Sequence, residues 1–328
     1  MSAFLFALSA VTPIILMIAL GYCLRRVGIL NESFTKVANK LVFRTLLPAM
    51  LFLNIYRIES FGDMELDYIF YVSFAVLGIF LLNLPLVLFL SRDNTRRGPM
   101  LQASFRSNYA LIGIPLATSL YGEAGGIVAS LLSAAVVPVF NALAVIALSI
   151  FRKDGEKPSV KKVLLSIVKN PLILSIAAGL VALGIRALFV RIGITFRFAD
   201  LTPVYKVLEY LSGAATPIAL LVLGAQFEFS RISGYKKELT YSVLTRCVLT
   251  PLLGIGIALL FFRDRFGGAE FAAFIAAFAT PVAVSSVPMT QEMDGDTALA
   301  GQIVIFTTLT SALTTFLATF ILRSIGVF

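Results

Sequence analysis

Histidine and tryptophan are absent from the 328 residues, and cysteine occurs only twice. Without histidine, the chain lacks the commonest general base and the commonest metal ligand in proteins. It therefore contains neither a Ser-His dyad nor a zinc-binding HExxH motif, and we expect it not to be an enzyme. Cys23 and Cys247 lie in apolar runs 224 positions apart (247 − 23), so they predict neither a disulfide framework nor a metal site.

Charged residues are also scarce, at 14% of the chain, whereas 59% of residues are hydrophobic and the mean hydropathy is +0.93. A soluble domain has about 25% charged and about 45–50% apolar residues. The apolar excess lies in long runs such as Phe4–Leu24 and Ile69–Leu90, and a helix needs about 20 such residues to cross a bilayer. These features exclude a soluble enzyme and a disordered chain and predict an all-α polytopic membrane protein. The net charge of +9 is typical of basic residues at membrane helix ends, so nucleic acid is not an expected partner.

The hydrophobic runs predict ten transmembrane helices. Their approximate ranges are 5–24, 37–56, 68–90, 100–121, 125–150, 163–185, 204–227, 239–262, 268–291 and 298–322. The polar segment 152–162 contains charged residues, a glycine and a proline, and we interpret it as a linker. It divides the chain into a first half of five spans (1–151) and a second half of five spans (163–328).

The distribution of lysine and arginine predicts the orientation of these spans, because cytoplasmic loops carry an excess of both. If the N-terminus lies outside, 14 basic residues fall in inner loops and 7 in outer segments. The count favours both termini on the non-cytoplasmic side of a plasma membrane, the bacterial inner membrane, with the linker in the cytoplasm. Since each half has an odd number of spans, the second half then runs inverted relative to the first.

One stretch indicates that the two halves are related. At a constant offset of 173, residues 105–122 align without gaps on residues 278–295, and Pro115 falls on Pro288. Each stretch belongs to the fourth span of its half, that is, to the fourth and ninth spans of the chain. The alignment therefore predicts two inverted five-helix repeats.

Both of these spans contain helix breakers and small polar side chains. The first has Asn108, Gly113 and Pro115; the second has Pro281, Ser285, Ser286 and Pro288. Breakers free backbone groups that lipid cannot satisfy, and paired broken helices in two inverted halves indicate a transporter site at the midplane of the membrane. The N-termini of half-helices offer unpaired N–H groups and a positive dipole end, which favour an anionic ligand. A proline kink used only for packing is the alternative for either span.

The sequence around these breakers resembles the auxin efflux carrier family, which includes plant auxin exporters and bacterial dicarboxylate permeases. The fourth-span signature is Asn108-x-x-Leu-x-Gly113-Ile-Pro115-Leu, followed by Tyr121-Gly122. Similar matches occur, in order, in the first, second, seventh and eighth spans. They are Leu20-Gly-Tyr-Cys-Leu-Arg-Arg26, Leu46-Leu-Pro-Ala-x-Leu-Phe52, Ala215-Thr-Pro-Ile-Ala-Leu220, and Arg246 with Pro251.

The resemblance implies a fold like that of bile-acid/sodium symporters, in which broken fourth and ninth helices cross beside the substrate. It places the crossing at Pro115 and Pro288, with Pro281 as an additional breaker, and assigns Asn108 to the substrate or to a half-helix cap. One position departs from the family. Plant auxin exporters have a serine three residues after the second-span proline, and this chain has Leu51. A small carboxylate of bacterial type, such as malate or malonate, is therefore expected rather than auxin.

Two arginines lie within predicted spans, where a charge is costly and often functional. We include Arg246 among the substrate-binding candidates because its guanidinium can bind a carboxylate in bidentate fashion. Arg106 could bind a carboxylate in the same way, but we expect it instead to reach the membrane interface or to pair with a structural carboxylate.

Thr290, Gln291 and Glu292 close the ninth span. Their oxygens could hold a coupling ion, sodium or a proton, or they could form a solvated helix end. The expected function is therefore secondary transport of organic carboxylates by alternating access, and the alternative is a passive uniporter or channel-like facilitator on the same fold. No cofactor is expected besides a coupling ion. The expected partners are a small organic carboxylate and the lipid bilayer, with a homodimer left open.

Overall fold

The computed structural model describes residues 3–57, 66–151, 165, 168–227 and 234–328, and in this part of the chain the regular structure is helical. The side chains of residues 3–11, 14 and 134 are not described, and the predicted linker 152–162 lies outside the described residues. The α-helices are α1 (Ala3–Arg26), α2 (Glu32–Leu41), α3 (Leu47–Tyr56), α4 (Leu66–Leu90), α5 (Asn94–Phe105), α6 (Ile114–Ile150), α8 (Pro171–Arg191), α9 (Thr202–Gln226), α10 (Lys236–Leu244), α11 (Thr250–Phe261), α12 (Gly268–Phe278), α13 (Ser286–Glu292) and α14 (Thr297–Ser324). Three π-helical turns, η1 (Val42–Leu46), η2 (Tyr109–Gly113) and η5 (Thr245–Leu249), and one 3₁₀ turn, η3 (Phe198–Asp200), join them.

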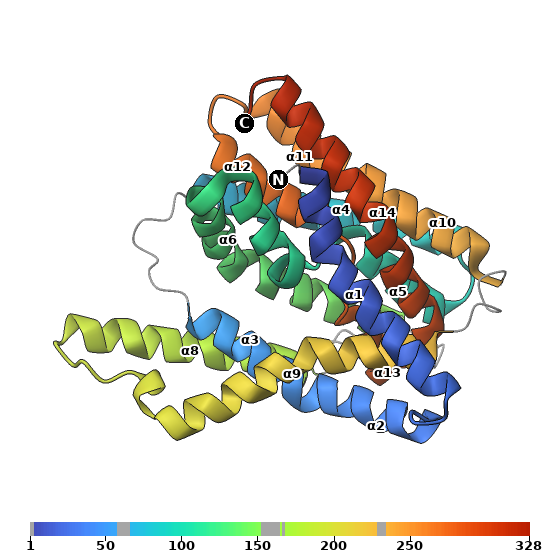
Figure 1. Ribbon diagram of the computed structural model, residues 1–328. Helices are drawn as coiled ribbons and strands as arrows, with labels where there is room; N and C mark the ends of the chain where they lie inside the picture. Colours follow the sequence, from blue (N-terminus) through green and yellow to red (C-terminus); the bar gives the residue numbers. More distant parts are fainter. Residues whose placement is uncertain (1–2, 58–65, 152–164, 166–167, 228–233) are drawn as a thin grey trace.

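Helix is present in each of the ten segments that hydropathy predicted. Within the described residues, six helical stretches are long and apolar enough to cross a membrane, and Ala135–Ile150 and Gly268–Phe278 are shorter apolar helices. The chain thus has the helices of a multi-pass membrane protein, and the number of ten crossings stays a prediction. The N-terminal end of α1 and the C-terminal end of α14 lie at the same end of the molecule (Figure 1).

A π-helical turn precedes a proline at three places in the chain. Each of η1, η2 and η5 ends two residues before one, at Pro48, Pro115 and Pro251 respectively. Proline has no N–H to donate, and its ring clashes with the carbonyl four residues earlier. A wider π turn lets the helix continue through this defect, so these prolines widen the helix rather than end it.

The helices form two groups (Figure 1). We call α2, η1, α3, α8 and α9 the scaffold layer; α3 packs against α8 and α9, and α2 packs against α9. We call α5, η2, α6, α12 and α13 the crossing bundle, which α4, α10, α11 and α14 cover. Helix α1 connects the two groups because it packs against both α9 and α14.

Glycines allow α1 and α9 to approach with their backbones in contact. A Cβ atom added to Gly224 would lie 1.9 Å from the Ile18 carbonyl oxygen, and one added to Gly21 would lie 2.1 Å from the Leu221 carbonyl oxygen. Real Cβ atoms do not come this close to other atoms, so the crossing requires glycine at both positions. Small residues at helix contacts are the usual means of packing helices in membranes.

Candidate functional site

Two interrupted helices meet at the centre of the candidate site. Helix α5 ends at Phe105, and Arg106 has extended backbone angles (φ −84°, ψ 106°) before η2 begins. Helix α12 ends at Phe278, and α13 begins only at Ser286. The unwound strands pair antiparallel through a bridge between Ser107 and Val282, and the Asn108 N–H donates to the Pro281 carbonyl oxygen at 2.8 Å.

The breaks lie upstream of the residues that were predicted to cause them. Asn108 precedes Pro115 by seven positions (115 − 108), and Pro281 precedes Pro288 by the same number (288 − 281). Pro115 is exposed in the first turn of α6, and Pro288 is buried within α13. The prediction that Pro115 and Pro288 themselves interrupt the helices is therefore wrong in its position, because a proline in the first helical turn is compatible with the helix.

Side chains from neighbouring helices satisfy the backbone of the unwound segment after α12. The Arg246 guanidinium, fully buried on η5, donates from Nε to the Thr280 carbonyl at 2.8 Å and from Nη2 to the Ala277 carbonyl at 3.0 Å. Thr307 on α14 accepts the Val282 N–H at 3.3 Å. Arg246 thus caps the C-terminal end of α12, where the helix dipole favours a cation. It does not line the crossover cavity, so its place in the candidate site is structural.

Arg106 lies in the crossing itself and has only neutral partners among the described residues. Its side chain is 3% exposed, and Nη2 donates to the Asn141 amide oxygen at 2.8 Å and to Ser285 Oγ at 2.9 Å. Nη1 donates to the Gln102 amide oxygen at 2.9 Å and contacts the Met289 sulfur. In this structure Arg106 therefore reaches neither the interface nor a structural carboxylate, contrary to the expectation from the sequence. It places a buried positive charge beside Ser285 without a counter-ion from the described part of the protein.

A cavity of about 230 Å³ lies between the crossing and the scaffold layer, and we call it the crossover cavity. Its walls come from α3, α9, the first turn of η2 and the segment before α13. The lining residues are Leu47, Met50, Asn54, Asn108, Ala110, Leu111, Ser212, Ala215, Thr216, Ala219, Val284 and Ser285. The buried Asn108 Nδ2 atom has no hydrogen-bond partner among the described residues, so a residue that lines the cavity carries an unused donor.

The crossover cavity adjoins a larger one of about 790 Å³, which we call the outer cavity. Asn54 and Ala110 line both cavities. The outer cavity also contains Glu123, just after a kink in α6 at Tyr121 and Gly122. Gly122 adopts φ 63° and ψ −152°, a conformation that glycine adopts without strain. The candidate site is therefore approached from the end of the molecule where α3 ends and α6 bends.

The structure separates the predicted site residues into several groups. Asn108 and Ser285 line the crossover cavity. Pro281 and Ser286 are buried next to them, and Gly113 lies where an added Cβ would contact Ala276 of α12 at 3.1 Å.

The three residues predicted as a coupling-ion or support site lie at the opposite end of α13. Thr290 donates to the Ser286 carbonyl, Gln291 bonds to Asn39 and Gln226, and Glu292 pairs with Arg44. Gln291 and Glu292 therefore contact the scaffold layer, whereas Thr290 accepts a hydrogen bond from Gln102 of α5 at 3.5 Å, and none of the three lines the crossover cavity. Within the described residues, no group of three or more Cys, Asp or Glu side chains could hold a metal ion.

Sequence reasoning left out Asn54, Ser212 and Thr216, and it did not place Arg106 among the site residues. Ser212 and Thr216 are four positions apart on α9 and so share one face of that helix. Thr216 belongs to the Ala215-Thr216-Pro217 motif of the family resemblance, and this motif could have identified it as a candidate site residue. Asn54 comes from a predominantly apolar helix, and no local pattern marks it.

Comparisons with known proteins agree with this picture. The profile of a family described as "Membrane transport protein" matches residues 6–319. An uncharacterised transporter of Methanothermobacter thermautotrophicus is 21% identical over 310 residues, which cover 94% of this chain and 96% of the relative. An uncharacterised transporter of Methanocaldococcus jannaschii is 25% identical over 122 residues, covering 36% of this chain and 39% of the relative.

Proposed function

This chain belongs to the membrane transport protein family, of auxin efflux carrier type, and from that premise we propose that it is a secondary transporter of small organic carboxylates. The observation that carries the substrate class is Arg106, a nearly completely buried guanidinium whose described partners are all neutral. A charged arginine at the centre of a membrane costs at least about 2.5–3.5 kcal/mol. The negative charge of a bound carboxylate substrate would offset part of that cost.

The groups around the crossover cavity support an anionic ligand in the same place. Asn108 offers an unused amide donor, and Ser285 joins the cavity to Arg106 at 2.9 Å. Ala110 and Leu111 lie in the first turn after the break, where helix N–H groups lack intrahelical partners. Hydrogen bonds to a charged group contribute roughly 1.5–3 kcal/mol each, enough for the moderate affinity that a transporter needs.

The arrangement of the crossing supports the inverted-repeat fold. The offset of 173 that aligned Pro115 with Pro288 also aligns Asn108 with Pro281, and these two residues pair through their backbones. Antiparallel pairing at aligned positions is what a two-fold axis in the membrane plane would produce. We place the protein in a bacterial inner membrane with both termini outside, on the basis of the 14-to-7 charge count.

A passive uniporter or channel-like facilitator is the second candidate, because none of the described residues that line the crossover cavity is acidic. Transport assays on proteoliposomes that contain the purified protein distinguish the two functions. Uptake of radiolabelled malonate that responds to a sodium or proton gradient supports coupled transport, whereas saturable exchange that ignores both supports a uniporter. If neither malonate nor malate is taken up or exchanged and only cations or neutral solutes bind, the proposed substrate class is wrong.

A further inference from the structure

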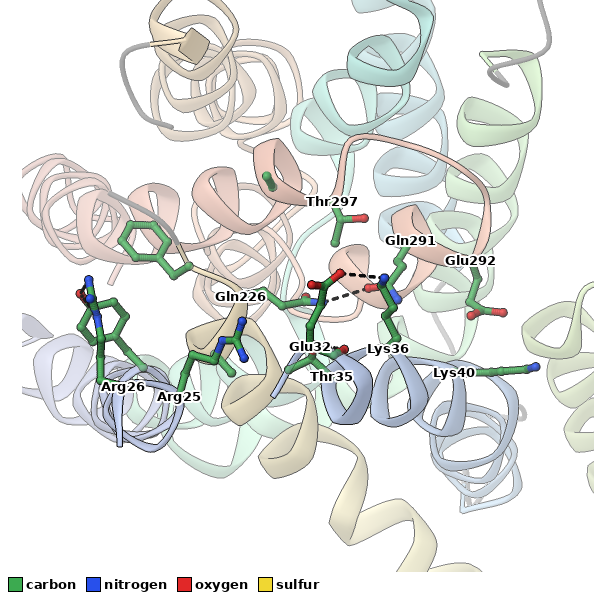
Figure 2. A pocket seen from close by; sticks show the side chains of 14 residues that line it. Arg25, Arg26, Glu32, Thr35, Lys36, Lys40, Gln226, Gln291, Glu292 and Thr297 are labelled. Atoms are coloured by element: carbon green, nitrogen blue, oxygen red, sulfur yellow. Dashed lines mark hydrogen bonds and ion pairs between the residues drawn. The ribbon is translucent and has the colours of Figure 1, made fainter. Parts of the chain in front are cut away.

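A third cavity, of about 1150 Å³, lies at the opposite end of α13 from the crossover cavity. Helices α1, α9 and α13 end here, and α2 and α14 begin here. Four cationic side chains line it, namely those of Arg25, Arg26, Lys36 and Lys40 (Figure 2). We call it the basic cavity. It shares no lining residue with the crossover cavity, so in this structure the two are separate.

Helix α13 forms the partition, since Ser285 just before it lines the crossover cavity and Gln291 and Glu292 at its end line the basic cavity. Gln291 accepts from Asn39 Nδ2 and, at 3.2 Å, from Gln226 Nε2; Figure 2 shows the two glutamines pointing toward each other. Asn39 also donates to the Gln226 amide oxygen at 3.2 Å. This three-amide cluster ties α13 to α2 and α9 of the scaffold layer.

An ion pair next to the amide cluster makes a second link between the same two groups of helices. Arg44 Nε on η1 lies 3.3 Å from Glu292 Oε2 on α13. Arg44 is 61% exposed and Glu292 is 15% exposed, so water from the basic cavity reaches the pair. At the other end of the molecule, Arg57 pairs with Glu209 at 2.6 Å, but both residues belong to the scaffold layer. That pair therefore does not hold the crossing bundle against the scaffold.

We propose that Gln291 and Glu292, with Asn39, Gln226 and Arg44, form the gate between the crossover cavity and the basic cavity. The gate is closed in this structure, and the site opens toward the outer cavity. This inference rests on the proposed transport function and assigns the last turn of α13 to control of access rather than to a coupling ion. Neutral amide bonds and a partly hydrated ion pair suit a contact that must break and re-form in every transport cycle, because water replaces each bond when the gate opens.

The experiment measures access to the crossover cavity without any substrate. In full-length protein carrying Cys23→Ser and Cys247→Ser, Ser212→Cys reports labelling by a membrane-impermeant maleimide from either side of reconstituted vesicles. Separate Lys36→Cys and Glu123→Cys proteins identify which side holds the basic cavity and which the outer cavity. We expect Glu292→Gln to speed labelling of Ser212→Cys from the Lys36 side by about fivefold, the population shift that loss of one net hydrogen bond causes. Gln291→Ala removes the bonds to both Asn39 and Gln226 and should speed labelling by at least as much. Labelling from the Glu123 side should slow.

Glu209→Gln is the matched control, since it breaks an ion pair that lies within the scaffold layer; we expect it to leave both labelling rates unchanged. The double variant Arg44→Glu with Glu292→Arg restores the pair with reversed charges and should return the rate to that of the background protein. Unchanged labelling in Glu292→Gln, or an equal rise from both sides, would overturn the gate. If labelling shifts sides but the vesicles transport no carboxylate, the gate stands and the proposed substrate is wrong.

Discussion

Asn108 donates its backbone N–H to the carbonyl oxygen of Pro281 at 2.8 Å, and these are the residues that a constant sequence offset of 173 places at the same position of the two halves. The Ala283 N–H extends the pairing to the Arg106 carbonyl at 3.4 Å. Pairing at the break lets each unwound segment satisfy part of the other's backbone, as apolar surroundings demand. It also fixes Arg106 and Ser285, which lie on opposite strands of the crossing, within hydrogen-bond distance.

Replacing Arg106 by glutamine should strongly impair transport without unfolding the protein. Glutamine keeps hydrogen-bonding capacity toward Asn141 and Ser285 but removes the buried charge. We expect malonate uptake to fall by at least about tenfold, since a bond to a charged group contributes roughly 1.5–3 kcal/mol. The melting temperature should stay the same or rise, because an unpaired buried charge is destabilising. Arg106→Lys, which retains the charge without the fork, should be intermediate; uptake at the background level in Arg106→Gln would refute the anion site.

Asn108→Ala tests the unused donor in the crossover cavity. Because Asn108 Nδ2 has no partner in the described part of the chain, its removal should cost little stability while weakening substrate binding. We expect uptake at limiting malonate to drop by about tenfold or more, corresponding to one hydrogen bond of roughly 1.5–3 kcal/mol to a charged group. Uptake is compared with a melting curve of the same preparation. A large loss of thermal stability with normal uptake would show that Asn108 is structural.

Arg246→Gln should show the opposite pattern from Arg106→Gln. It removes the cation that caps α12 through the carbonyls of Ala277 and Thr280. We expect a loss of about 2–5 kcal/mol in the free energy of unfolding, because two buried carbonyls lose charged donors. Thermal unfolding in detergent measures it, and an unchanged melting temperature would argue against the capping role.

The contact between α1 and α9 gives a prediction that concerns stability alone. Gly224→Ala places a methyl group 1.9 Å from the Ile18 carbonyl oxygen, so the helices must separate. We expect a loss of about 1–3 kcal/mol or more. Gly213→Ala on the same helix meets no atom within 4 Å and should be neutral or stabilising by about 0.5–1 kcal/mol. Equal melting temperatures for the two variants would contradict the close approach.

Orientation in the membrane is tested by single cysteines on a background without Cys23 and Cys247. The charge count predicts that a cysteine at position 36, in the basic cavity, reacts only with reagent added from the cytoplasm. A cysteine at position 123, in the outer cavity, should react only from outside. The reverse pattern would invert the proposed topology. Labelling of both positions from the same side would contradict the proposal that the basic cavity and the outer cavity open on opposite sides of the membrane.

The sequence by itself determined the class of protein and the positions of its apolar helices. Long apolar runs and their spacing are local properties, and the bilayer requires a helix wherever such a run crosses it. The offset of 173 was also readable, because breakers such as Pro115 and Pro288 recur at matching positions of the two halves. Asn108 and Ser285 could be selected for the same reason, as polar residues beside those breakers.

Only the tertiary structure shows which groups surround the two buried arginines. Arg246 lies beside carbonyls that become free where α12 unwinds, 31 and 34 positions further along the chain, and Arg106 meets Ser285 at a separation of 179. Whether a buried guanidinium caps a helix or awaits an anion depends on which groups other helices bring to it, and no local pattern contains that information. Asn54, Ser212 and Thr216 reach the crossover cavity for the same reason, because packing of α3 and α9 against the crossing puts them there.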